Sequence, residues 1–323
     1  MNRRRFLTTL AGAGVGSVIA FKSLGRLPAG ETPRATLVRD AQSLSQGHCD
    51  PLRVQWLLER LIRNHYNSAD PVEVFRRLFS PRDRIGIKVN CLSGRRMSTH
   101  TELVDAIVKL LLQADVPPQN ILIWDRLNAD LRNAGFTIST AGNNVLCTGC
   151  DALGYESELT VHRSIGSLLT KAVTTLCTAQ INVPVLKDHG IVGVTLGMKN
   201  FFGAIHNPNK YHPNCGDPYV ADLYSLAEIG GSVRLTIVDA LEVQCEGGPP
   251  YQPDWCQDYG GLMTANDPIA LDRIGWKLIE EMRYNRGLPT LAEQKREPTY
   301  IHTAAKLKLG VAELSQITFD QLD

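Results

Sequence analysis

The stretch Ile181–His206, INVPVLKDHGIVGVTLGMKNFFGAIH, determines how the rest of the chain is interpreted. Its first six residues, 181–186, form an apolar run with the length and composition of a buried strand. Two basic side chains, Lys187 and His189, follow where that strand should end. A strand end that carries cations and leads into a helix is a natural place to hold an anion.

The residues after Gly190 predict a helix, because apolar side chains there recur with a period near 3.6. On such a helix Thr195, Lys199 and His206 would share roughly one face. The alternative interpretation is an ordinary strand–helix unit whose lysines are solvated, since lysine is usually exposed.

The flanking sequence repeats this alternation of strands and helices. Strands are expected at 85–90, 121–124 and 233–239, and an amphipathic helix at 102–113 lies between the first two. Other helices should begin at aspartate–proline pairs, at 50–51, 70–71 and 267–268. The expected fold is therefore α/β, a mainly parallel sheet with helices on both faces, in one body or in two lobes.

The charge of the chain is unevenly distributed. The 323 residues include 34 basic and 33 acidic ones, and five of the basic residues lie in residues 1–30, which contain no acid. The remaining chain therefore carries 29 basic and 33 acidic residues, a net charge of −4. A nucleic-acid-binding protein normally presents a net basic face, so no nucleic-acid partner is expected.

Residues 1–30 have the pattern of a twin-arginine signal peptide. Asn2-Arg3-Arg4-Arg5-Phe6-Leu7 precedes a mildly apolar, glycine-containing segment. We expect an exported protein, periplasmic or otherwise extracytoplasmic, that uses the twin-arginine machinery. The signal peptide is either cleaved or kept as an uncleaved signal anchor. The mature chain should contain no transmembrane span. It is divided into a helical lead-in, 31–83, and an α/β domain, 84–323.

Polar residues follow several of the predicted strands and suggest a shared cleft for a small-molecule ligand. Ligands of open parallel sheets bind beyond the carboxyl ends of the strands. In this hypothesis Lys187 and Lys199 hold or polarise an anion, His189 is a general acid or base, and Asp239 orients or ligates. The expected ligand-binding residues are Lys88, Asn90, Thr195 and Asn200. Loops are polar in any case, so a chance arrangement is the alternative.

Cysteine and histidine residues leave the cofactor open. Cys147 and Cys150 form a C-x-x-C pair, which suits a redox pair, half of a metal site or a local disulfide. With His206 and His212 they are the candidate ligands of a transition metal. No ferredoxin-type run of cysteines occurs in the sequence.

The sequence resembles the domain of unknown function 362 family, from about residue 84 to 283. Four blocks carry the resemblance: IGIKVNCLSG at 85–94, INVPVLKDHGIVGVTLGMKNFFGAI at 181–205, IVDALEVQCEGGP at 237–249 and LMTANDPIALDRIG at 262–275. The family implies no settled reaction. Some members carry an added iron–sulfur segment with clustered cysteines, which this chain lacks.

Three functions therefore remain open. The first is an enzyme that acts on a small anionic or carbonyl-bearing molecule. The second is a metal- or iron–sulfur-associated periplasmic electron-transfer partner, and the third is a non-catalytic binding module.

Overall fold

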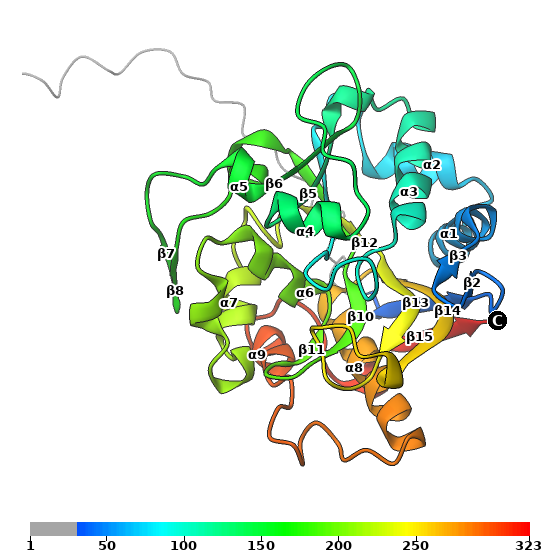
Figure 1. Ribbon diagram of the computed structural model, residues 1–323, viewed down its shortest axis with the longest axis vertical. Helices are drawn as coiled ribbons and strands as arrows, with labels where there is room; N and C mark the ends of the chain where they lie inside the picture. Colours follow the sequence, from blue (N-terminus) through cyan, green and yellow to red (C-terminus); the bar gives the residue numbers. More distant parts are fainter. Residues whose placement is uncertain (1–30) are drawn as a thin grey trace, which may run out of the picture.

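The computed structural model describes residues 31–323 (Figure 1). Most of its strands belong to two sheets, and the chain passes directly from one sheet into the other. The first sheet is entirely parallel. In sheet order it consists of β12 (Val233–Thr236), β9 (Ala179–Asn182), β4 (Ile85–Lys88), β5 (Ile121–Asp125) and β6 (Leu146–Gly149).

The second sheet is mixed. Its order is β11 (Gly193–Thr195), β10 (Val185–His189), β13 (Val238–Gln244), β14 (Cys256–Ala265), β1 (Arg34–Arg39) and β15 (Thr318–Leu322). Two short hairpins lie outside these sheets, β2 (Leu44–Ser45) with β3 (His48–Cys49), and β7 (Thr160–His162) with β8 (Ile165–Ser167).

Helices cover the sheets from two sides. One apolar cluster lies under α1 (Pro51–Tyr66), α2 (Pro71–Leu78) and α3 (Thr101–Gln113). The other lies under α6 (Gly197–Asn200), α7 (Tyr219–Tyr224), α8 (Pro268–Asn285) and α9 (Tyr300–Lys306), and Figure 1 shows α7 and α9 on the opposite side from α1 and α3. Short helices α4 (Asn128–Asn133) and α5 (Cys150–Leu153) flank β5 and β6. The α/β fold class expected from the sequence is confirmed.

The expected helix starts at the aspartate–proline pairs are present. Asp50, Asp70 and Asp267 each accept hydrogen bonds from backbone N–H groups in the first turn of α1, α2 and α8. These bonds satisfy donors that have no partner inside a helix. Within residues 31–323 no helix is both long and apolar enough to cross a bilayer.

The chain passes from the parallel sheet to the mixed sheet at two places. β9 ends at Asn182 and β10 begins two residues after Val183, while β12 leads through Ile237 into β13. Backbone bonds continue through both crossings, since Ile237 N donates to Asn182 O (2.9 Å) and Asp239 N donates to Pro184 O (2.8 Å). The two apolar runs predicted as single strands, 181–186 and 233–239, therefore each serve two sheets.

The helix predicted directly after Gly190 is wrong. Residues 193–195 form β11, which pairs antiparallel with β10 and places Thr195 opposite Lys187. The apolar residues Val192, Val194 and Leu196 alternate with Gly193 and Thr195, which is the period of a strand, and the helix begins only at Gly197. Gly193 makes the turn possible with a φ of +85°, a conformation that favours glycine.

The segment 31–83, expected to be a helical lead-in, also supplies a strand of the mixed sheet. It contains α1 and α2, but β1 lies between β14 and β15. Leu37 packs in one apolar cluster and its neighbour Val38 in the other, because successive strand residues face opposite sides of a sheet. The predicted signal peptide, residues 1–30, lies outside the described residues.

Candidate functional site

A cleft of about 360 Å³ lies where the ends of β4 and β5 meet β10, β11 and α6. Most of the residues predicted from the sequence line it: Lys88, Asn90, Lys187, His189, Thr195, Lys199, Asn200 and the metal candidate His212. The topology explains the convergence, since the crossing at Val183 brings β10 over the carboxyl end of β4. Asp239 is absent from the lining.

Lys88 forms a wall of the cleft as one member of a buried ion pair. Its ammonium donates to Asp125 Oδ1 (2.7 Å), Val89 O (2.5 Å) and Asn200 Oδ1 (3.2 Å), so all three N–H groups have acceptors. Asp125 Oδ2 accepts from Cys91 N at 2.7 Å. This pair therefore positions α6 and the β4–α3 loop (89–100), and its lysine has no N–H left for a ligand.

Lys187 is fully buried in the middle of β10, two residues before the strand end that was expected to carry it. Its ammonium donates to Ser93 Oγ and Met97 O, both at 2.7 Å, and these acceptors are uncharged. Burial lowers the pKa of Lys187 to about 7. Lys187 thus holds the β4–α3 loop and keeps one N–H for the cleft.

Lys199 is the cleft lysine without a polar partner. Its ammonium lies 4.1 Å from the centre of the Phe202 ring, and it makes no hydrogen bond or ion pair within residues 31–323. Burial, together with the positive charges of Lys88 and Lys187, lowers the pKa of Lys199 to about 7. Near neutral pH, Lys199 is therefore an uncharged amine in a large fraction of the protein molecules.

His189 and His212 stack over the cleft with ring centres 5.4 Å apart. His189 Nδ1 accepts from Ile191 N (3.3 Å) and Val192 N (3.4 Å), so the proton of the neutral ring is on Nε2. His212 Nδ1 faces Pro208 O at 3.1 Å, which leaves Nε2 as its acceptor. Burial and the charge of Lys199 lower the pKa of His189 to about 2 and that of His212 to about 4. The two rings therefore present one donor and one acceptor.

Three further polar atoms at the cleft are buried without a hydrogen-bond partner in residues 31–323. They are Thr195 Oγ1, Asn90 Oδ1 and Arg126 Nε. A buried polar group that lacks a partner is costly, so these atoms are suited to contact a ligand. Arg126 was missed at the sequence level, although its place directly after the strand-end residue Asp125 was a signal.

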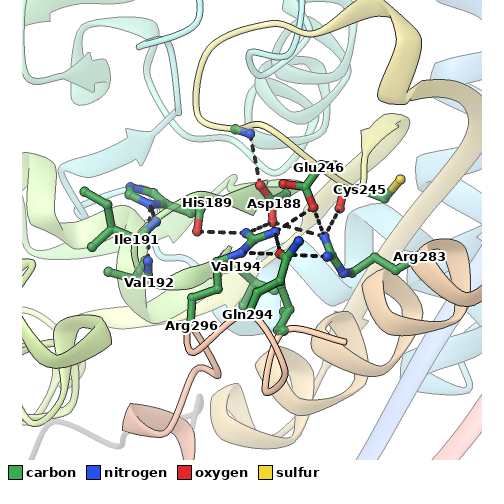
Figure 2. A network of polar contacts seen from close by, with 12 residues as sticks. Asp188, His189, Ile191, Val192, Val194, Cys245, Glu246, Arg283, Gln294 and Arg296 are labelled. Atoms are coloured by element: carbon green, nitrogen blue, oxygen red, sulfur yellow. Dashed lines mark hydrogen bonds and ion pairs between the residues drawn. The ribbon is translucent and has the colours of Figure 1, made fainter. Parts of the chain in front are cut away.

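A buried network of charges fixes the end of β10 from its other face (Figure 2). Asp188 contacts Arg296, whose guanidinium also donates to Glu246 at 2.7 Å and to His189 O at 3.4 Å. Arg283 donates to the same Glu246 carboxylate at 2.5 Å. Because Asp188 and His189 point to opposite sides of the strand, this network positions His189 without entering the cleft.

Asp239 does not join the lysines, contrary to the prediction. It is fully buried near the start of β13, far from the carboxyl end of that strand. Its carboxylate accepts from His100 N (2.8 Å), His100 Nδ1 (2.9 Å) and Leu241 N (3.1 Å). Asp239 therefore serves the end of the β4–α3 loop.

The candidate metal ligands do not form one site. Cys147 and Cys150 pack in different apolar clusters, and burial raises the pKa of both thiols to about 12. His206 Nδ1 accepts from Leu168 N at 3.0 Å, away from His212 in the lysine cleft. Within residues 31–323 no group of three or more His, Cys, Asp or Glu side chains has an arrangement that suits a metal ion.

We expect Gly203→Ala to destabilise the cleft wall. An added Cβ would lie 2.9 Å from Lys88 Cε and 3.1 Å from Asp125 Oδ1, inside a tightly held ion pair. The free energy of unfolding should fall by about 1–3 kcal/mol in urea denaturation. The matched control is Gly166→Ala, whose Cβ would meet only Leu159 Cδ2 at 3.9 Å and should change stability by less than about 0.5 kcal/mol. Equal losses in the two variants would contradict this account.

Comparisons with known proteins identify relatives and the family of this chain. A thylakoid-associated protein of Synechocystis is 26% identical over 258 residues, which cover 74% of this chain and 75% of that protein. A structure from Thermotoga maritima aligns with a TM-score of 0.40 and 9% identity, over 76% of this chain and 61% of that one. The model of a domain of unknown function, DUF362, matches residues 85–277, well over half of the chain. The chain belongs to the DUF362 family.

Proposed function

We propose that the protein is an enzyme that acts on a small molecule with an anionic group and a carbonyl group, bound in the lysine cleft. The observation that carries the proposal is Lys199, a buried amine with a pKa of about 7 and no polar partner in residues 31–323. A desolvated lysine beside other cations is the usual form of an amine nucleophile.

The anionic group of the substrate would lie near Lys187 and Arg126. Lys187 has one N–H that is not used by Ser93 or Met97, and Arg126 Nε is buried without a partner in the described chain. Asp125 neutralises Lys88, and Asp130, which also lines the cleft, offsets part of the charge of Arg126. The positive charge available to a ligand therefore rests on Arg126 and on the charged fractions of Lys187 and Lys199. Charge complementarity of this kind favours a carboxylate or phosphate.

The carbonyl group would meet Lys199. The amine nitrogen attacks the carbonyl carbon, a C–N bond forms, and the two amine protons leave with the carbonyl oxygen as water, which gives an imine. In this proposal the Nε2–H of His189 stabilises the developing oxyanion and Nε2 of His212 moves the proton, since both Nδ1 atoms are already hydrogen-bonded to the backbone. In this arrangement His189 is a hydrogen-bond donor and His212 the base.

Replacement of Lys199 should abolish covalent capture of a carbonyl compound. We expect borohydride to trap an adduct on Lys199 when the protein is incubated with small 2-oxo acids such as pyruvate. Lys199→Met keeps an apolar stem over Phe202 and removes the amine, so peptide mass spectrometry should find no adduct.

The matched control is Lys210→Met, which removes an exposed lysine next to Tyr211 and should leave the adduct on Lys199 unchanged. If the 2-oxo acids were trapped on surface lysines as readily as on Lys199, the proposed role of this amine would be wrong. The same result would favour a non-catalytic binding module.

The pH dependence follows from the lowered pKa of the two lysines. Since the charged form is lost as pH rises through about 7, sulfate should bind the cleft more weakly at pH 8 than at about pH 6. Reductive methylation of Lys199 should instead become faster over that range and then level off. Free N-acetyl-lysine is the reference, because its unperturbed amine becomes more reactive up to about pH 10. A Lys199 profile that follows this reference would contradict the assigned pKa.

We also propose that residues 1–30 direct export by the twin-arginine machinery, because Arg3 and Arg4 precede a mildly apolar segment. Replacement of both arginines by lysine should keep the full-length protein in the cytoplasm of a host with this route, as measured by cell fractionation. Changing Lys22 and Arg26 instead should leave export intact. Unimpaired export of the double-lysine variant would contradict this proposal.

A further inference from the structure

A second cavity, of about 340 Å³, lies between the β2–β3 hairpin and the residues that lead into α3. Its lining includes Cys49 on β3, His100 before α3 and the arginines Arg95 and Arg96. It shares no lining residue with the lysine cleft, although the β4–α3 loop contributes to both.

The hairpin that carries Cys49 is held firmly against the mixed sheet. Its turn contains Gly47 with a φ of +74°, and the guanidinium of Arg96 packs where a Cβ of this residue would lie. Arg96 in turn pairs with the buried carboxylate of Glu242 on β13. The thiol is thereby fixed relative to β13, the strand that also carries Asp239.

His100 lies between Cys49 and Asp239 at this cavity. Asp239 Oδ2 contacts His100 Nδ1 at 2.9 Å and also accepts from His100 N at 2.8 Å. The Cys49 side chain lines the same cavity and interacts electrostatically with the imidazole. With Nδ1 directed at Asp239, Nε2 is the ring nitrogen left for the thiol.

The electrostatics stabilise the charged form of the His100 ring. Burial lowers the pKa of His100, but the charge and hydrogen bond of Asp239, together with Cys49, outweigh it and raise this pKa well above its usual value. Burial raises the pKa of the Cys49 thiol, and the His100 ring opposes that rise. A thiolate formed at Cys49 therefore has a stabilised imidazolium beside it.

The other half-buried thiols have no such partner. Cys215 Sγ lies against Lys295 O, Cys256 Sγ lies against Gln252 O, and Cys177 interacts with Gln180 and Arg84. Among the cysteines of residues 31–323, Cys49 alone interacts with a histidine. A thiol, a ring and an orienting carboxylate in a cavity are the parts of a nucleophilic site.

We propose that Cys49, His100 and Asp239 form a second reactive site, at which the Cys49 sulfur accepts an acyl group from a small ester or thioester. The sulfur attacks the carbonyl carbon and an S–C bond forms. The bond from that carbon to the leaving oxygen or sulfur breaks, and the thiol proton passes through His100 Nε2 to the leaving group. Exposed Arg95 has no acidic partner in the described chain, which favours an acyl donor with negative charge.

The test is acylation of the full-length protein by p-nitrophenyl acetate, with the acetyl group located by peptide mass spectrometry. We expect Cys49 to be acetylated at least about tenfold faster than Cys215 or Cys256 at pH 8. His100→Asn keeps a donor for Asp239 and removes Nε2, so it should slow acetylation of Cys49 about tenfold. Acetylation of Cys215 should not change, which also shows that the variant is folded.

A second variant tests whether Asp239 orients the His100 ring, separately from any effect on folding. Asp239→Asn keeps the shape of the side chain and removes the charge, and it should also slow acetylation of Cys49 while Cys215 reacts as before. The proposal is overturned if Cys49 reacts no faster than Cys215 and Cys256, or if His100→Asn leaves its rate unchanged.

Discussion

The two crossings between the sheets are the constraint on which the rest of the molecule depends. At Asn182 and again at Thr236 the chain leaves the parallel sheet and enters the mixed sheet, and backbone bonds continue through both places. The crossings place β10 beside the ends of β4 and β5. Residues that are nearly a hundred positions apart, such as Lys88 and Lys187, thereby line one cleft. The same geometry places Asp239 behind the cleft, where it meets His100.

The three buried lysines of the cleft show how differently the same side chain can be accommodated. Lys88 is matched by Asp125, Lys187 has only uncharged acceptors, and Lys199 has an aromatic ring. Removing an ammonium from water costs several kcal/mol unless a partner compensates. The lowered pKa of Lys187 and Lys199 is the response to that cost, and it leaves part of both side chains as uncharged amines near neutral pH.

Much of the fold could be predicted from local sequence, because its signals are local. The aspartate–proline caps at Asp50, Asp70 and Asp267 mark three helices, and the apolar runs mark β4, β5 and β9. The cations of the cleft were also predictable, since strand ends of a parallel sheet converge.

The remaining features depend on tertiary contacts that no local pattern records. The apolar residues of 192–196 are compatible with the period of two of a strand and with the period of 3.6 of a helix. This segment forms a strand because it pairs with β10. Asp239 does not join the cleft because the apolar run 233–239 spans β12 and the start of β13, so this residue is not at the carboxyl end of a strand. Cys147 and Cys150 are close in sequence but point into separate cores.

The position of β1 has a consequence for the biogenesis of the protein. This strand is made first, yet its neighbours are β14 and β15, and Arg34 pairs with Thr318 near the other end of the chain. During synthesis, which proceeds from the N-terminus, β1 must therefore wait for its partners with both edges unpaired. The mixed sheet can close only after β14 and β15 have been made. For most of synthesis β1 is therefore a strand with exposed edges, which can pair with the wrong partner.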